Sequence, residues 1–278
     1  MSRAARSIKS SSFATAPMKA ATMGSDGLSR QGLVDYLHQL LDCGRFRDYG
    51  PNGLQVEGCD EILRIATACT ASRAAIEAAV SAGANALIVH HGILWDKAPL
   101  PVTGMLKGRL APLLRHDCSL LAYHLPLDAH PVHGNNAVLL GELGLKDFKP
   151  FAEYYGQPIG LWADSPQPLL ISDLSHQLSA IVGHEVLHCP GNGEQVSRIG
   201  AVTGGGQSCL LAAATAGCQV LITGEASEQS WHEAQESGCH LLAAGHHATE
   251  SIAVHRIGEA LASRFHLAHH VIDIPNPI

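Results

Sequence analysis

The sequence predicts an α/β protein made of two similar three-layer αβα halves with mixed or parallel sheets. Hydrophobic residues make up 46% of the 278 residues and charged residues only 15%, which is ample for a packed core. Short, nearly continuous apolar runs alternate with helical periodicity, as expected of strands whose two faces are both covered by helices. This alternation occurs twice, on either side of a Pro-containing middle segment.

Four segments follow from this pattern: a disordered N-terminal extension, a first half, a connecting segment and a second half. They are residues 1–28, 29–148, 149–195 and 196–278. The first 25 residues carry four basic and no acidic residues and are rich in Ser and Ala. We interpret them as a disordered tail. An organelle transit peptide is the alternative, because such peptides share this composition.

The first half is predicted to alternate helices and strands. Ser29 is a candidate N-cap for the first helix, because leucines repeat on one helical face directly after it. Residues 45–58 contain Gly-Pro and Asn-Gly pairs and are predicted to be a loop. The following elements are a strand at 62–68, a helix at 72–82, a strand at 86–90, a helix at 105–116 and a strand at 119–124.

The second half repeats this order after a helix-like stretch at 169–182 in the connecting segment. Its elements are a strand at 199–203, a helix at 208–216, a strand at 220–223, a helix at 228–237, a strand at 241–244, a helix to about 265 and a strand at 271–274. The eight cysteines are scattered without zinc-finger spacing, so we expect reduced, buried thiols.

Composition also excludes several classes of protein. The chain has no run of about 18 apolar residues, so a membrane span is not expected. The formal net charge is −7, and residues 26–278 hold 14 basic and 25 acidic residues. This acidic balance argues against nucleic-acid binding.

Histidines and carboxylates gather where three predicted strands end. The chain has 18 His, as many as Lys and Arg together. The residues at these strand ends are His90, His91, His124, Asp128, His246 and Glu250. Ligands bind at the carboxyl ends of strands in open α/β sheets, and imidazoles with carboxylates suit divalent ions. The sequence therefore predicts a metal site at the strand ends between the halves.

Several other residues have two interpretations. Glu225 either lies in the first turn of a helix or faces the site. Residues 204–206 are three glycines after a strand, which we interpret as a tight turn rather than a phosphate loop. Trp95 and Trp231 can stack on a base, although a core or rim position is more common for tryptophan.

Ordered motifs over residues 34–278 resemble the GTP cyclohydrolase type 2 homolog family, the NIF-three-like dinuclear metal proteins. The motifs are Asp48-Tyr49-Gly50-Pro51-Asn52-Gly53-Leu54-Gln55-Val56-Glu57-Gly58, Val89-His90-His91-Gly92, His124-Leu125-Pro126-Leu127-Asp128-Ala129-His130-Pro131, Gly134-Asn135-Asn136, Thr203-Gly204-Gly205-Gly206-Gln207-Ser208, Ile222-Thr223-Gly224-Glu225, Gly245-His246-His247-Ala248-Thr249-Glu250 and Ile272-Asp273-Ile274-Pro275-Asn276-Pro277. The length is similar to that of the short form of the family, which lacks an inserted domain.

The resemblance implies two divalent ions per subunit, such as zinc, iron or manganese. Their implied ligands are His90, His91, Asp128, His246 and Glu250. Glu250 is implied to bridge the ions, with His91 and Asp128 on one and His90 and His246 on the other. Beside these ligands, His124 and Glu225 are implied to orient them. The resemblance also implies a cytoplasmic homo-oligomer, a hexameric ring.

Two functions follow as hypotheses. The first is a metal-dependent hydrolase, GTP cyclohydrolase-like, acting on a nucleotide or a related small molecule. The alternative is a non-catalytic protein that binds or delivers metal to an acceptor, or forms a ring-shaped scaffold. If the N-terminal extension is a transit peptide, we expect the protein in an organelle instead of the cytoplasm.

Overall fold

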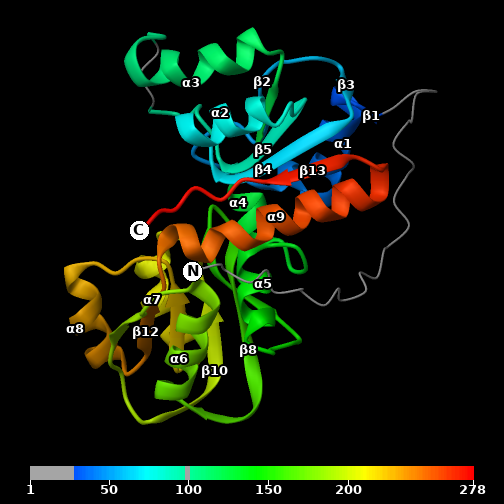
Figure 1. Cartoon of the computed structure of the whole chain (residues 1–278). Helices are drawn as coiled ribbons and strands as arrows, with labels where there is room; N and C mark the ends of the chain where they lie inside the picture. Colours follow the sequence, from blue (N-terminus) through cyan, green and yellow to red (C-terminus); the bar gives the residue numbers. More distant parts are fainter. Residues whose placement is uncertain (1–27, 98–100) are drawn as a thin grey trace, which may run out of the picture.

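Two β-sheets, each covered by helices on both faces, form the structure (Figure 1). The computed structural model describes residues 28–97 and 101–278. The predicted N-terminal extension lies outside the described residues except for Leu28, which is 2% exposed and belongs to a short strand. The predicted αβα architecture of both halves is confirmed.

The first sheet has the strand order β13-β4-β5-β6-β2. Its strands are β2 (Gly53–Val56), β4 (Arg64–Thr70), β5 (Ala86–His91), β6 (Ser119–Ala122) and β13 (Ala268–Val271). Only β2 runs antiparallel to its neighbour. Buried side chains of α1 (Arg30–Leu41) and α9 (His246–Phe265) pack on one face, and those of α2 (Arg73–Ser81) and α3 (Gly104–Arg115) pack on the other.

Local signals in the first half act as expected, with one exception. The Ser29 hydroxyl accepts a hydrogen bond from the Gly32 N–H at 3.0 Å, which caps α1. Likewise the Ser72 hydroxyl accepts from the Ala75 N–H at 3.1 Å and caps α2. The predicted loop at 45–58 was wrong in part, because β2 lies inside it and pairs with β6 at the sheet edge.

The second sheet has the order β7-β8-β10-β11-β12-β9. Its strands are β7 (Lys149–Tyr154), β8 (Gln157–Leu170), β9 (Leu187–Cys189), β10 (Gln195–Ala201), β11 (Val220–Thr223) and β12 (His240–Ala243). The central three are parallel and the flanking ones antiparallel. Helices α5 (Asn135–Glu142) and α6 (Ile171–Val182) pack on one face, and α7 (Leu210–Thr215) and α8 (Glu228–Ser237) pack on the other.

Smaller elements complete the chain. They are the antiparallel pair β1 (Leu28–Ser29) and β3 (Glu61–Ile62), the helix α4 (Leu125–Ala129), and the 3-10 turns η1 (Cys43–Arg45) and η2 (Gly206–Cys209). The eight cysteines are free, as predicted, although Cys59 and Cys209 are only half-buried. Among residues 28–97 and 101–278, no helix combines the length and apolar character that crossing a membrane requires.

The chain does not divide between the sheets as the sequence pattern suggests. Residues 149–195, interpreted from sequence as a connecting segment, supply β7, β8 and β9 to the second sheet and α6 to the helices that cover it. The last strand begins at Ala268 rather than at 271 and pairs with β4 in the first sheet. The partners of a strand can be distant in the sequence. The hydrophobic pattern therefore indicates that a segment is a strand, but not which sheet the strand joins. The domain boundaries themselves stay a prediction.

Helix α9 connects the second sheet to the first. It begins at His246, directly after β12 of the second sheet and the Gly245 turn, where φ is +86°. Its body then packs against β4 and β5 of the first sheet, with Val254 and Leu261 buried in the same core as α1. In Figure 1 this helix lies across the middle of the molecule. Its first turns therefore lie at the strand ends of both sheets.

Under α9, two histidines share one buried hydroxyl. The Thr67 Oγ1 atom lies 2.9 Å from His255 Nδ1 and 2.8 Å from His269 Nε2. Burial lowers the pKa of His255 to about 4; Asp273 opposes this shift, and the nearby His269 and His247 add to it. An unfolded histidine has a pKa of about 6.5, so between these values the unfolded chain binds the extra proton and acid destabilises the fold.

We therefore expect the free energy of unfolding to fall more steeply with acid in the wild-type chain than in His255→Gln. Between pH 7 and pH 4.5 the difference should be about 2 kcal/mol. Urea unfolding of both proteins at several pH values measures it. The exposed His232→Gln on α8 is the control and should follow the wild type. Parallel curves for His255→Gln and the wild type would contradict this assignment.

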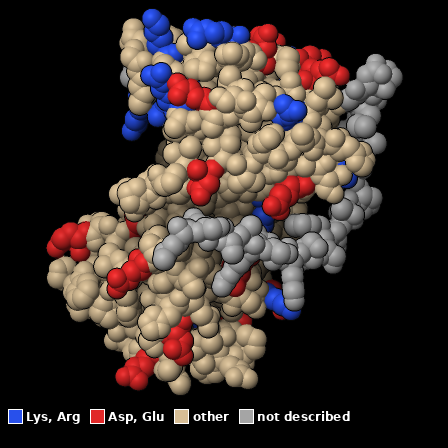
Figure 2. Space-filling view, in the orientation of Figure 1, with Lys and Arg blue, Asp and Glu red and all other residues tan. Residues whose placement is uncertain are grey.

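Charge is unevenly spread over the surface. On the face drawn in Figure 2, most of the Lys and Arg gather at the end that carries α2 and α3, whereas Asp and Glu are scattered over the whole face, this end included. Most of this face is uncharged, as the low content of charged residues leads one to expect.

Candidate metal site

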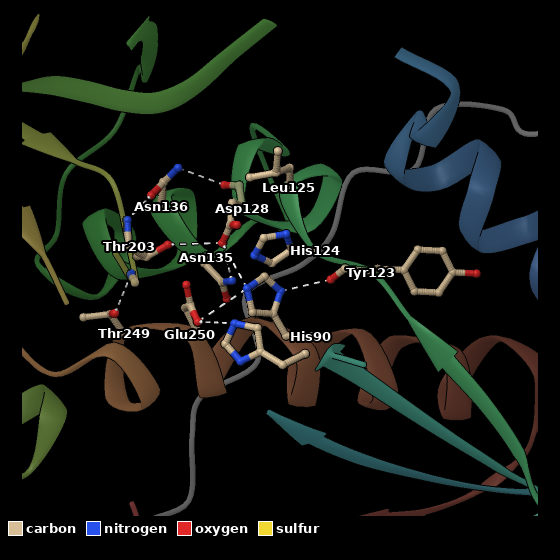
Figure 3. A network of polar contacts seen from close by, with 12 residues as sticks. His90, Tyr123, His124, Leu125, Asp128, Asn135, Asn136, Thr203, Thr249 and Glu250 are labelled. Carbon is tan, nitrogen blue, oxygen red and sulfur yellow. Dashed lines mark hydrogen bonds and ion pairs between the residues drawn. The ribbon is translucent and has the colours of Figure 1, made fainter. Parts of the chain in front are cut away.

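The five side chains that the resemblance implies as ligands come together between the two sheets. His90 and His91 are the last residues of β5, and Asp128 lies in α4 just after β6. His246 and Glu250 occupy the first turns of α9. Figure 3 shows His90, Asp128 and Glu250 directed toward one another. Residues from distant parts of the chain thus meet where β5, β6 and β12 end.

Glu250 lies at the centre of this cluster. Its Oε2 atom is 3.4 Å from His90 Nε2, 3.2 Å from His91 Nε2 and 3.1 Å from His246 Nε2. Two tetrahedral ligands at about 2.1 Å from one ion are about 3.4 Å apart, so these separations suit ligands of shared cations. Only 3% of the Glu250 side chain is exposed.

Hydrogen bonds hold two of these imidazole rings in the form that presents a lone pair to the site. His90 Nδ1 donates to the Tyr123 carbonyl at 2.9 Å (Figure 3). His246 Nδ1 donates to Glu225 Oε1 at 2.6 Å. In each neutral ring the proton therefore sits on Nδ1, and Nε2 is left as a metal-ligating atom.

At the centre of the site, a buried imidazole nitrogen and a buried carboxylate oxygen face each other, and each can accept a proton or bind a cation. His90 Nε2 and Glu250 Oε2 are buried and make no hydrogen bond. Because burying unpaired polar atoms is costly, the arrangement demands either protons or cations between nitrogen and oxygen. Histidine and carboxylate donors fit a divalent cation of the zinc, iron or manganese type.

Without a cation, the site must draw protons instead. Burial disfavours a charged His90, but Asp128 and Glu250 outweigh it and raise its pKa to about 9. The Glu250 carboxylate 3.1 Å away raises the pKa of His246 to about 9 as well, against a smaller effect of burial. Burial lowers the pKa of His91 to about 4, with neighbouring His90 adding to the shift. Burial works against ionisation of Glu250, yet His90 and His246 hold its pKa well below the usual range.

A network of side chains to which the sequence analysis assigned no role holds Asp128. Asn135 Nδ2 donates to Asp128 Oδ1 at 2.8 Å, and the Thr203 hydroxyl donates to the same oxygen at 3.3 Å. Asn136 Nδ2 donates to the Asp128 carbonyl at 2.9 Å, and Asn136 Oδ1 accepts from the Thr203 N–H. The sequence signal that could have revealed this network is the pair of adjacent asparagines after Gly134. Amide side chains at the start of a helix can hydrogen-bond a metal-ligating carboxylate and orient it.

Glu225, left open from sequence, contacts the site. It follows β11 and accepts from His246, as described above. His91 is held differently, since its Nδ1 lies 3.1 Å from the Thr70 hydroxyl of the adjacent strand β4. Each ring at the site is therefore oriented by a partner on its far side.

His124 is closer to the ligands than the sequence analysis placed it. Its ring nitrogen lies within 4.8 Å of ring nitrogens of His90 and His91, so the three form a candidate ligand group of their own. Asp128 Oδ1 is 3.5 Å from His90 Nε2, and these two form a further candidate ligand group with Glu250.

Cys69 is a further neighbour that the cysteine count did not reveal. Its Sγ lies within 4.8 Å of ligand atoms of His91 and Glu250. The thiol is 2% exposed, and burial together with Glu250 keeps its pKa far above the ordinary value. In the absence of a metal it is a neutral thiol.

Asp48 fixes His124 from the side away from the cluster. His124 Nδ1 donates to Asp48 Oδ1 at 2.7 Å, and the Leu125 N–H donates to Oδ2 at 2.9 Å. Asn52 Nδ2 donates to the same Oδ2 at 2.8 Å. Burial opposes ionisation of Asp48, but the hydrogen bond from His124 and its partners lowers its pKa. The carboxylate thus ties the loop before β2 to the site.

We expect Asp48→Ala to weaken divalent-metal binding by about 10- to 100-fold, the usual effect of removing a partner that orients a ligand. Competition with a chromophoric chelator measures the affinity. The exposed Asp96, on the neighbouring loop, supplies the control Asp96→Ala, which should bind metal like the wild type. Equal metal affinities for Asp48→Ala and the wild type would contradict a contribution of the Asp48–His124 pair to metal binding.

Gly204 lies against the Glu250 carboxylate. Its φ is +62°, and a Cβ built there overlaps Glu250 Oε1 and comes within 3.0 Å of His246 Nε2. The Gly204 carbonyl accepts from the Gly224 N–H at 2.8 Å. The turn predicted at residues 204–206 therefore has a second purpose, since only glycine leaves room for the carboxylate.

A cavity of about 630 Å³ opens onto the cluster. His91, Asp128, His246 and Glu250 form its floor, and Trp95, for which the sequence left stacking or a core or rim position open, lies in its wall. Pockets of this size hold small molecules. A ligand in the cavity would reach the candidate metal ligands directly.

Two αβα layers with imidazoles and carboxylates at their facing strand ends define a class of α/β proteins with a candidate metal centre open to a cavity. Comparison with known proteins agrees with this class. A model of the Duf34/NIF3 (NGG1p interacting factor 3) family matches residues 28–277. The chain belongs to this family, and the resemblance inferred from its motifs is confirmed.

Relatives extend over nearly the whole chain. The "GTP cyclohydrolase 1 type 2 homolog" of Yersinia pestis is 44% identical over 254 residues, covering 88% of this chain and 98% of the relative. The solved structure of the protein ybgI, described as of unknown function, matches with a TM-score of 0.85 at 41% identity over 90% of this chain and 100% of that chain. The solved structure of TTHA1606 from Thermus thermophilus matches with a TM-score of 0.82 at 34% identity over the same shares.

Proposed function

We propose that this protein is a dinuclear metal-dependent hydrolase acting on a nucleotide or a related small molecule. One observation carries the proposal: Glu250 Oε2 is buried at 3.1–3.4 Å from three imidazole nitrogens, at the floor of a cavity. The names of relatives, "GTP cyclohydrolase 1 type 2 homolog", support a nucleotide as the substrate class.

The donor atoms support a division between two ions that share Glu250. We assign His90 and Asp128 to one ion, with His124 beside them, and His91 and His246 to the other. Two carboxylates leave four positive charges half-neutralised, so an anionic substrate group is favoured at the centre. When bound, two divalent ions would supply Lewis acidity toward a substrate oxygen and would lower the pKa of water at the site.

The residues of the chain then have separate roles. Glu225 and the Tyr123 carbonyl hold the His246 and His90 rings with Nε2 toward the site. Asn135 and Thr203 hold Asp128 and restrict its rotation. Three protein donors for each ion, counting Glu250 twice, leave positions open toward the cavity, which is typical of catalytic rather than structural sites.

The test is turnover by protein whose metal content is known. Protein purified without added metal is first assayed by elemental analysis, then loaded with zinc, iron or manganese and offered GTP and other nucleotides. We expect hydrolysis that is lost in Glu250→Gln and retained in Glu259→Gln, an exposed carboxylate on the same helix. Fully loaded protein without turnover of any nucleotide or phosphoester would overturn the hydrolase proposal.

A second candidate is metal delivery without catalysis. It is favoured by the partial exposure of two ligands, since 18% of the His91 side chain and 28% of the His246 side chain are open to the cavity. Transfer of ions to an acceptor apoprotein within minutes would support delivery. Ions that resist chelators for days would contradict it.

We further propose, from the family resemblance, that the subunits form a hexameric ring in the cytoplasm. Light scattering of the purified protein tests the assembly. A monomer at micromolar concentration would overturn it. Cell fractionation of the full chain, with N-terminal sequencing of the mature protein, separates the cytoplasmic location from the organelle alternative.

A further inference from the structure

We infer that the cavity above the candidate metal site is a binding site for a planar aromatic ring, which lies against Tyr49 and Trp95. The inference deepens the proposed function and rests on it for the role of the ring. It names which part of a substrate points away from the ions and which residues recognise it.

The first observation is the concentration of aromatic side chains in one wall. Tyr49, Trp95 and Tyr154 all line the cavity, although the whole chain is only 5% aromatic. The Tyr49 and Tyr154 ring centroids are 5.3 Å apart, and the Trp95 ring is 5.2 Å from that of His124. The aromatic wall therefore begins at the candidate ligands and continues along the cavity.

The second observation is that the Trp95 ring and the backbone that carries Tyr49 are held in place, although neither side chain is fully buried. Trp95 Nε1 donates to the Gly92 carbonyl at 3.2 Å, in the turn that follows His90 and His91. The Asp96 N–H donates to the Tyr49 carbonyl at 2.8 Å and joins the two loops. Half of Tyr49, 48%, is nevertheless exposed. A rigid, accessible aromatic face binds at low entropic cost.

The third observation concerns charge. Among the described residues that line the cavity, there is no lysine or arginine, and Glu153 adds a carboxylate to the wall. A polyphosphate chain therefore finds no cationic side chain there and is directed to the metal ions. The aromatic wall instead suits an uncharged planar heterocycle, because stacking on tyrosine and tryptophan needs only a π-face.

These observations place a nucleoside-like ligand in one orientation. Its ring lies against Tyr49 and Trp95, and its anionic group lies at the metal-binding floor. Tyr154 reaches the wall from β7 of the second sheet, whereas Tyr49 and Trp95 come from the first half of the chain. The binding site for the ring is therefore assembled from both layers.

Binding of inosine and of ribose 5-phosphate to the zinc-loaded protein separates the two ends of the ligand. Equilibrium dialysis should show that Tyr49→Leu and Trp95→Leu each weaken inosine binding about tenfold, as loss of one stacking partner does. Ribose 5-phosphate binding should stay within about twofold. Tyr49→Phe and Trp95→Phe retain an aromatic face and should bind inosine within about threefold of the wild type.

Two matched controls lie outside the cavity. Tyr155, next to Tyr154 and 62% exposed, and Trp231, 45% exposed on α8, do not line it, so Tyr155→Leu and Trp231→Leu should leave both affinities unchanged. Zinc content measured on each variant shows that the metal site is intact.

Three results would overturn the inference. They are wild-type protein that does not bind inosine, leucine variants that bind it unchanged, and leucine variants that lose inosine and ribose 5-phosphate binding equally. Inosine binding that depends on Tyr49 and Trp95 without any nucleotide turnover would leave the inference standing and count against the hydrolase alone.

Discussion

Glu250→Gln is expected to abolish tight binding of divalent metal, with an affinity loss of at least about 100-fold. The amide has the size of the carboxylate but no charge, and Glu250 Oε2 is the atom that His90, His91 and His246 all face. Loss of an orienting partner alone costs about 10- to 100-fold, and Glu250 is proposed to bind both ions directly. Elemental analysis and chelator competition give the stoichiometry and the affinity.

The control for this substitution lies nine residues further along the same helix. Glu259→Gln changes the net charge equally but at an exposed position, and it should keep the wild-type metal content. A Glu250→Gln protein that still holds two tightly bound ions would refute the placement of Glu250 between them.

Gly204→Ala is expected to have the next largest effect, by displacing the Glu250 carboxylate. The added methyl group overlaps Glu250 Oε1, and the left-handed backbone at φ +62° costs an L-residue about 1–2 kcal/mol in addition. The Gly204 carbonyl is held by the Gly224 N–H, so the backbone cannot easily move away. We expect metal affinity to fall more than tenfold and the free energy of unfolding to fall by about 1–3 kcal/mol.

The next residue provides a close control. Gly205 has φ −78°, and a Cβ there meets its first neighbours only at 3.9–4.0 Å. Gly205→Ala should therefore keep both the metal affinity and the stability of the wild type. If the two alanine variants behaved alike, steric exclusion at Gly204 would not be the reason for its glycine. Chelator competition and urea unfolding decide between these outcomes.

Secondary structure could be predicted well wherever short-range signals specify it. Ser29 caps its helix as predicted, the helix predicted from residue 72 begins next to its Ser72 cap, and β11 and α8 have the predicted bounds. The errors fall where strands pair over long distances. Strand β2, with four residues at a sheet edge, has a pattern too short to distinguish from the turns beside it.

The candidate site was predictable to the extent that its residues belong to recognisable strand ends. His90, His91 and His246 directly follow apolar runs, so the expectation of a common location needed only the rule for strand ends. Asp48 and Thr203 were missed as contributors, because a buried carboxylate in a loop and a threonine after a strand have many other uses. Their roles depend on hydrogen bonds to His124 and Asp128.

The amino-acid sequence by itself determined the αβα class, the order of most elements and the ligand types, because burial periodicity, caps and residue chemistry are local properties. Only the tertiary structure decided that Asp128 lies beside His90, that Gly204 makes room for Glu250, and that Tyr49, Trp95 and Tyr154 share one wall. The reason is physical: these relations depend on how α9 and the two sheets pack together, and packing joins residues that no short-range pattern connects.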